Sequence, residues 1–254
     1  MKLLINLIII LSFSFNVSSR EVGETEITTE DGIEVFQNEK FYLLKKNVKI
    51  NSDNFILNAD EVKINFNKSL YDITELNAKG NVDFNLTEFK MHGKGKTLNF
   101  EVQTEKLKVE GQNSKLNTEE IQMFSDGFIK VNNTNGNFLL EGENSKLVGE
   151  NILIVAGFID GIFSIDGGSN EITFLNVFDK KISYVKNNNT EMYAKKINFD
   201  KSTSIIELID NVTIIRDGEK ISGNYGTLDT KNNSYKIKSN DETKVKVIIL
   251  NNGQ

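Results

Sequence analysis

Hydrophobic and polar residues alternate along most of this chain, and the alternation slips by one position at recurring places. Leu57 and Ala59 share one phase, whereas Val62 and Ile64 share the other. Alternation at a period of two is typical of a half-buried strand. A slip requires a bulge or a bend if one face is to remain apolar. The pattern therefore predicts strands that turn a corner near Asp60.

The same short motif occurs seven times: an apolar residue, a spacer, Ala or Gly, and an apolar residue five positions later. A repeat on this length scale indicates stacked units. Successive copies are 18 to 34 residues apart, which is too irregular for a tightly coiled parallel β-helix and favours antiparallel strands joined by turns. A small residue is expected at each corner because a larger side chain would obstruct the bend. The predicted corner residues are Ala59, Gly93, Gly111, Gly142, Gly167, Ala194 and Gly223.

A second recurring element is a polar dipeptide followed by Val or another apolar residue and renewed alternation. Such dipeptides are turn formers, so each is predicted to be a turn between two strands. They are Lys46-Asn47, Gly80-Asn81, Asp210-Asn211 and, in a looser form, Asp126-Gly127.

The predicted fold is all-β, a bent antiparallel β-jellyroll built from stacked strand-corner-strand repeats. Its two sheets fold around an apolar groove. Residues 20–254 are expected to form one elongated jellyroll, and two halves, 30–117 and 118–250, are the alternative. Seven units stacked at about 4.8 Å per strand would make a trough roughly 30 to 35 Å long.

The apolar phase of these units supplies the candidate lining of the groove. These side chains either fill a core or leave a slot for acyl chains, because large sheet interiors enclose ligands when side chains do not fill them. The pattern alone does not separate the two. The candidates are Val48, Ile50, Phe55, Leu57, Val62, Ile64, Phe66, Val82, Phe84, Met91, Leu98, Phe100, Ile197, Phe199, Ile206, Leu208, Val212, Ile214, Ile221 and Leu228.

The first nineteen residues differ from the rest. Lys2 precedes an apolar run from Leu3 to Phe15, and small residues at 17–19 offer a cleavage site. The run is shorter than the ~20 residues that span a bilayer. Residues 1–19 are therefore predicted to be a cleavable signal peptide that exports the chain to the periplasm, with retention as an anchor as the alternative.

Composition excludes several classes of function. The chain has no Cys and no Pro, one His and a formal net charge of −6, so thiolate and multi-His metal sites are absent and nucleic acid is not an expected partner. His92 is expected to be a solvent-facing strand residue. Gly93-Lys94-Gly95-Lys96-Thr97 lacks the first Gly of a P-loop, and Asp166-Gly167-Gly168 lacks a calcium-loop spacing. We expect no catalytic residues, no metal site, no cofactor and no enzymatic activity.

Two segments resemble the repeat of the OstA/LptA family of lipopolysaccharide transport proteins. They are Ala59 to Phe66 with Ala78 to Val82, and Leu208 to Ile214 with Ile221 to Gly223. The resemblance covers about residues 30–117 and 185–240, whereas 118–184 follows it loosely. The chain departs from the family pattern where Lys195 and Asn224 stand at positions normally occupied by Asp.

The resemblance implies a β-jellyroll that stacks head to tail into a periplasmic bridge and carries lipopolysaccharide or a related lipid. Implied partners are other Lpt jellyrolls, an inner-membrane LptC-like and an outer-membrane LptD-like protein, or copies of the chain itself. The alternatives are an LptC-like membrane-anchored organiser and a structural β-scaffold. Docking edges are expected at Ile33 to Leu44 and at Tyr235 to Lys238 or Lys244 to Ile249, unless the Lys residues there simply protect the edge from pairing.

Overall fold

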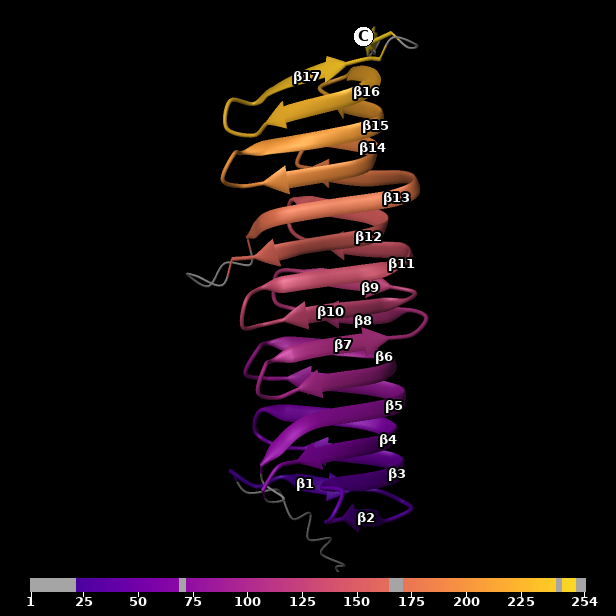
Figure 1. Ribbon diagram of the computed structural model, residues 1–254, viewed down its shortest axis with the longest axis vertical. Helices are drawn as coiled ribbons and strands as arrows, with labels where there is room; N and C mark the ends of the chain where they lie inside the picture. The colour runs from indigo at the N-terminus through magenta and orange to yellow at the C-terminus, as the bar shows by residue number, and fades with distance from the viewer. Residues whose placement is uncertain (1–21, 69–71, 165–170, 241–243, 250–254) are drawn as a thin grey trace, which may run out of the picture.

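The computed structural model describes residues 22–68, 72–164, 171–240 and 244–249, and every regular element within them is a β-strand (Figure 1). The first nine are β1 (Glu26–Thr28), β2 (Ile33–Phe36), β3 (Phe41–Asn51), β4 (Phe55–Phe66), β5 (Ile73–Leu86), β6 (Met91–Glu101), β7 (Lys106–Glu110), β8 (Ser114–Asn117) and β9 (Gln122–Ser125). The others are β10 (Phe128–Asn132), β11 (Asn137–Val148), β12 (Ile152–Phe163), β13 (Ile172–Asn187), β14 (Thr190–Asp200), β15 (Ile205–Arg216), β16 (Glu219–Asp229), β17 (Ser234–Lys238) and β18 (Lys246–Ile249).

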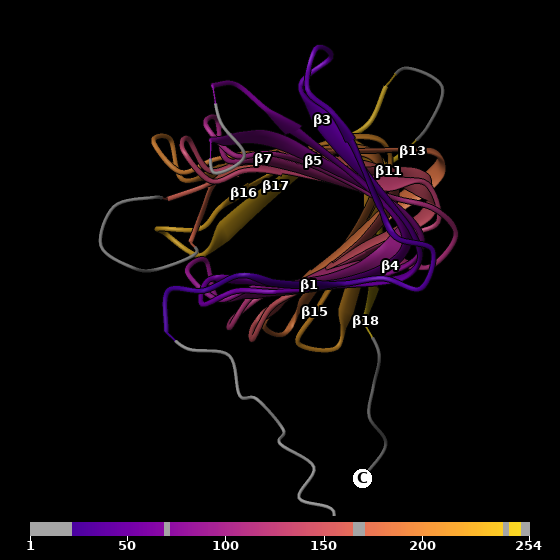
Figure 2. The same cartoon turned by 90° about the horizontal axis from the view of Figure 1, so that it is seen from below.

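The strands stack one above another along the long axis, and each long strand bends once (Figure 1). Bending divides the stack into two sheets. Sheet I contains β2, β7, β10, β17 and the halves of the long strands that pair with them; sheet II contains β1, β8, β9, β18 and the other halves. The sheets meet along one side of the stack and separate towards the other (Figure 2). The predicted all-β antiparallel jellyroll is confirmed.

The stack is about twice as long as the predicted trough. Ten strands, β3–β6 and β11–β16, bend without interruption, and the short strands form four further split levels, so the described residues make fourteen levels. At about 4.8 Å per level the stack is roughly 60 Å long. The prediction was too short because each sequence repeat contains two bent strands, one with the Ala or Gly motif and one with the polar dipeptide.

The polar dipeptides are not turns, and that prediction was wrong. Gly80 and Asn81 lie inside β5, with φ of 71° and 47°. The pairing of β5 with β6 skips them, from Lys79 opposite Thr97 to Val82 opposite Gly95. They therefore form a bulge at the bend, and the chain continues through it onto the other sheet without reversing. Lys46-Asn47 in β3 and Asp210-Asn211 in β15 have the same conformation and place.

Where the two sheets meet, the inward-facing residues form a column of small side chains, which we call the crease. In every second pair of neighbouring strands, two of these residues stand opposite each other beside the bend. Most of these residues are buried. They are small because a larger side chain at this point would force the two sheets apart. The crease pairs are Val48 with Ala59, Val82 with Gly95, Ser114 with Ser125, Ser145 with Ala156, Ser183 with Ala194, and Val212 with Gly223.

The structure places the predicted corner residues at slightly different points. Ala59, Ala194 and Gly223 belong to the crease. Gly111 and Gly142 lie three residues before the crease serines, in the bulges. Gly93 precedes the crease residue Gly95 by two positions; a Cβ there would lie 2.5 Å from the Phe84 ring. Gly167 lies outside the described residues, between β12 and β13.

Hydrogen bonds reinforce the bends. Asn81 Nδ2 in the β5 bulge donates to Asp60 Oδ2 in β4 at 2.9 Å, and Asn144 Nδ2 donates to Asp126 Oδ2 at 3.0 Å. On the inner side, Ser125 Oγ donates to the Glu141 carbonyl at 2.8 Å. The two amide–carboxylate bonds tie neighbouring bends together, and the serine bond satisfies a backbone carbonyl at a register shift.

The two ends of the stack expose residues of the inner face. At the first level, Ile33 and Val35 are 47% and 48% exposed; at the last level, Val247 is 55% exposed. The first edge is β1 with β2, and the last is β17 with β18. The predicted first edge extended too far, because Phe41–Leu44 belongs to β3, which pairs on both sides.

Candidate functional site

The predicted groove residues face the space between the sheets. All except Phe55 and Phe199, which are half-buried, are less than 10% exposed, and Leu57, Val62 and Leu208 are completely buried. All of them except Phe66 and Ile221 belong to, or pack against, one hydrophobic cluster that extends from Leu44 to Leu228. Side chains therefore pack most of the interior, and the candidate site lies where this interior reaches solvent.

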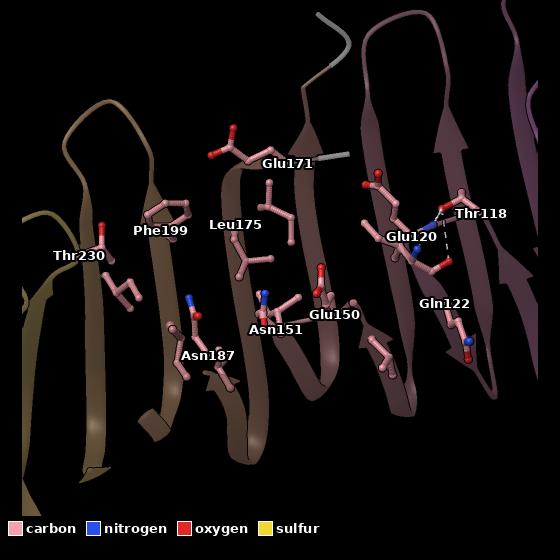
Figure 3. A pocket seen from close by; sticks show the side chains of 18 of the residues that line it. Thr118, Glu120, Gln122, Glu150, Asn151, Glu171, Leu175, Asn187, Phe199 and Thr230 are labelled. Carbon is pink, nitrogen blue, oxygen red and sulfur yellow. Dashed lines mark hydrogen bonds between the residues drawn. The ribbon is translucent and has the colours of Figure 1, made fainter. Parts of the chain in front are cut away.

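A cavity of about 950 Å³ opens on the side away from the crease, where the two sheets separate. We call it the mouth cavity. Strand ends and hairpins of both sheets surround it, and Figure 3 shows Leu175 and Phe199 among the polar side chains of its rim. Its apolar floor consists of Ile121, Ile152 and Val185 from sheet II, and Ile172, Leu175, Ile197, Phe199 and Ile206 from sheet I.

Hairpin hydrogen bonds hold the sheet II side of the mouth in place. The Thr118 amide donates to the Ile121 carbonyl at 2.8 Å, and the Gly149 amide donates to the Ile152 carbonyl at 2.9 Å. The Ile121 amide in turn donates to Thr118 Oγ1 at 3.1 Å. Each hairpin thereby keeps an apolar side chain at the cavity while its polar residues face water.

The floor is packed from below. Leu175 and Val185 are each 3% exposed, and Ile197 is 1% exposed. Access from the mouth cavity to the deeper interior therefore requires the two sheets to separate. The sheets are joined covalently through the bends at the crease, so separation at the mouth is the movement that the connectivity allows.

The rim is acidic. It carries Glu119, Glu120, Glu150 and Glu171, and the lining contains neither Lys nor Arg. Lys90 Nζ lies 3.0 Å from a Glu119 carboxylate oxygen, and Lys201 Nζ lies 2.6 Å from one of Glu171. These exposed pairs contribute little to stability. The rim is therefore polar and water-facing above an apolar floor.

Chemical groups for catalysis do not converge at the mouth. Within the described ranges no group of three or more His, Cys, Asp or Glu is placed to hold a metal ion. His92 is an exposed residue of β6, and its Nε2 lies 2.8 Å from Asn117 Nδ2. The apolar floor of the mouth cavity suits binding of an apolar group.

Sequence reasoning identified only part of this site. Of the candidates, Ile197, Phe199 and Ile206 line the mouth cavity, whereas the others lie along the packed interior. Five floor residues were missed: Ile121, Ile152, Ile172, Leu175 and Val185. Their alternation was visible in the sequence, but all five lie in or beside the stretch 118–184, where the repeat is loosest.

Comparisons with known proteins point to one family. Residues 30–155 match the family model described as LptA/(LptD N-terminal domain) LPS transport protein. No curated protein sequence matches the chain. Among solved structures, LptH from Pseudomonas aeruginosa, described as the LptA homologous periplasmic component of the lipopolysaccharide transport device, is 13% identical; the match covers 51% of this chain and 94% of LptH with a TM-score of 0.41. Across the described residues, no helix is long and apolar enough to cross a membrane.

Proposed function

Through residues 30–155 the chain belongs to the LptA/LptD N-terminal family of lipopolysaccharide transport proteins, and from that premise we propose that it binds lipopolysaccharide or a related lipid. In this proposal the acyl chains lie between the two sheets, entering at the mouth cavity. The protein is a periplasmic carrier or bridge that moves lipid from the inner to the outer membrane. The observation that supports this most strongly is the mouth cavity, where an otherwise packed apolar interior meets solvent.

The physical argument rests on burial. Transfer of an acyl chain out of water stabilises the complex by about 0.8 kcal/mol per buried CH₂. A cavity of about 950 Å³ is at the upper end of the size of small-molecule sites. The polar rim keeps the headgroup in water, because burying unpaired charges beside Glu150 or Glu171 would be costly.

The exposed ends of the stack support assembly with other jellyrolls. The terminal strands carry apolar side chains that point towards the space between the sheets but are exposed, namely Ile33, Val35 and Val247. A further jellyroll stacked on either end would cover them. The terminal strands also carry unpaired backbone groups, so a partner strand can add by β-augmentation. We propose head-to-tail contacts with a second copy, an LptC-like inner-membrane protein or an LptD-like outer-membrane protein. Lys236 and Lys246 on the last strands disfavour unspecific pairing.

An LptC-like organiser that stays anchored in the inner membrane is the second candidate. It shares the jellyroll and differs in the fate of residues 1–19. Sequencing the N-terminus of the exported protein distinguishes the two: a new N-terminus near Arg20 supports the soluble carrier, and a retained Met1 supports the anchored organiser.

Lipid content tests the proposal directly. The exported chain, purified without detergent, should yield bound lipid by mass spectrometry, and the glycolipid of the outer membrane should dominate. A structural scaffold would yield none. Replacement of Ile172, a half-buried residue of the cavity floor, by Asp should remove the lipid, whereas replacement of the rim residue Thr230 by Asp should leave it.

Assembly is tested by truncation. Removing residues 241–254 deletes β18 and should abolish capture of partner jellyrolls, while removing only 250–254 retains β18 and serves as the control. Undiminished capture by the longer truncation would show that this edge is not the contact.

A further inference from the structure

A second binding feature lies on the outer face of sheet I, beside the mouth. A hollow of about 620 Å³ extends over β6 to β13, and another of about 330 Å³ extends over β13 to β16. Phe174 lines both hollows, which therefore lie side by side, and we call the two together the outer trough. The predicted groove concerned only the inner face, and nothing in the lipid-binding proposal uses this surface.

The outer trough borders the mouth cavity. Strand pairing places Ile162, Phe174, Asp200 and Ile205 in one row across β12 to β15, close to the ends of these strands. Those ends form the sheet I side of the mouth. Phe199 lines both the mouth cavity and the smaller outer hollow. A ligand whose apolar part lies in the mouth can therefore continue over the edge of sheet I into the outer trough.

The trough combines planar polar groups with exposed apolar faces. Asn198 Nδ2 donates to Glu207 Oε2 at 3.2 Å, and the Tyr225 hydroxyl donates to Glu207 Oε1 at 2.8 Å. Phe174 and Ile162 lie between these groups and the lysines of the larger hollow. Their side chains are 40% and 36% exposed, respectively. Burial raises the pKa of Asp160, which also lines the trough.

One buried acceptor in this region has no partner. Asn176 stands between Asp160 and Asn198 in the strand pairing, and its Oδ1 is buried without a hydrogen bond among the described residues. Buried polar atoms are normally satisfied. Asn176 lines neither hollow itself, but it lies between the trough residues Asp160 and Asn198, where a bound hydroxyl group would be placed to donate to this oxygen.

We propose that the outer trough binds the oligosaccharide part of the glycolipid whose acyl chains occupy the mouth cavity. A sugar ring has apolar C–H faces that pack on Phe174 and Ile162, and hydroxyls that both donate to carboxylates and accept from amides and ammonium groups. An acyl chain would leave the polar groups unpaired, and the mixed charges of Lys106, Glu101 and Asp200 do not form the basic stripe that nucleic acid requires. This inference rests on the proposed function, because it assigns the second half of the same ligand.

The test uses an acyl-free oligosaccharide, released from the outer-membrane glycolipid by mild acid hydrolysis, and saturation-transfer NMR with the full exported chain. The wild type should bind it. Phe174→Ala should weaken binding about fivefold or more, since it removes the aromatic face on which a sugar ring packs. Phe178→Ala is the matched control: Phe178 lies on the same strand, is 44% exposed and lines neither hollow. It should bind like the wild type, and both variants should melt like the wild type.

Absence of oligosaccharide binding to the wild type, or equal weakening by the two variants, would overturn the inference. Lipid content is measured on the same samples. If Phe174→Ala keeps its lipid and loses the oligosaccharide, both proposals stand. If the wild type binds oligosaccharide and contains no lipid, the lipid-carrier proposal fails while the sugar site stands.

Discussion

The two long sides of the stack are built on opposite principles. At the crease, small buried residues such as Ala194 and Ser183 stand opposite each other, and side-chain hydrogen bonds fix the bends. At the mouth, larger apolar side chains such as Phe199 lie beneath a polar rim and are only partly covered. Close packing at the crease leaves no space for a larger side chain or a ligand, whereas the mouth contains the cavity of about 950 Å³. The difference indicates that close packing stabilises the fold at the crease, while the mouth offers the space that the proposed lipid binding requires.

This contrast also accounts for the way in which the interior could accept a ligand. The ten long strands cross the crease without interruption, so each of them links the two sheets there. On the mouth side, the described parts of the sheets meet through side chains, for example where Arg216 Nη1 donates to the Asn233 carbonyl at 3.5 Å and the Tyr235 hydroxyl donates to Glu219 Oε2 at 3.0 Å. Separating the sheets at the mouth therefore breaks dispersion contacts and a few such bonds, whereas separating them at the crease would break the bent strands. The same substitution should therefore have different consequences on the two sides.

Insertion of a charge should give the largest contrast. Ala194 is completely buried, so Ala194→Asp places an unpaired carboxylate in the crease and should destabilise the fold by several kcal/mol. Ile172→Asp places the same charge at the mouth, where water can reach it, and should fold but lose lipid. Solubility and circular dichroism of the exported variants check the expectation; a well-folded Ala194→Asp would contradict the role of the crease.

A matched pair of glycines gives a smaller effect. A Cβ at Gly223 would lie 2.5 Å from Ile237 Cγ2 and 2.6 Å from the Lys238 carbonyl oxygen. Gly223→Ala should therefore cost about 1 to 3 kcal/mol. A Cβ at Gly149, on a mouth hairpin, would meet only Ile152 Cγ2 at 3.1 Å as a close neighbour, and Gly149→Ala should cost less than about 0.5 kcal/mol. Urea unfolding measures both, and equal losses would remove the distinction.

Hydroxyl deletion should give the smallest of the three effects. Ser125 is 2% exposed and bonds the Glu141 carbonyl. Ser125→Ala leaves that carbonyl without this partner and should cost about 1 to 2 kcal/mol. Thr118→Ala removes a rim hydroxyl that accepts from the Ile121 amide, but water can take its place there, so the substitution should cost only about 0.5 kcal/mol. Thermal melting of the two variants measures which loses more stability. A larger loss for Thr118→Ala would contradict the stabilising role of the crease serines.

The bent antiparallel stack was predictable because a phase slip is a local signal. Where Leu57 and Ala59 give way to Val62 and Ile64, the burial pattern changes phase as the sequence does. The polar dipeptides were misinterpreted because two successive left-handed residues occur in both hairpin turns and bulges. Whether Gly80-Asn81 reverses the chain depends on which strands lie beside it, and that is a non-local property.

The crease serines and the mouth were harder to predict. The repeated motif contained only Ala or Gly, so it did not mark the inward-facing crease serines, which are Ser114, Ser125, Ser145 and Ser183. A serine in an alternating strand is normally counted as a polar, outward-facing residue. Their carbonyl partners become visible only once the register is known. The floor of the mouth joins residues from β8 to β15, and only the folded stack brings these segments together.

Photo-crosslinking in cells tests the central claim most directly, namely that lipid enters at the mouth. A photoreactive residue at Phe199, in the floor, is compared with one at Lys195, four positions earlier on β14 and outside the cavity lining. The account expects lipid adducts at Phe199 and none above background at Lys195. Equal labelling at both positions, or labelling at Lys195 alone, would contradict it.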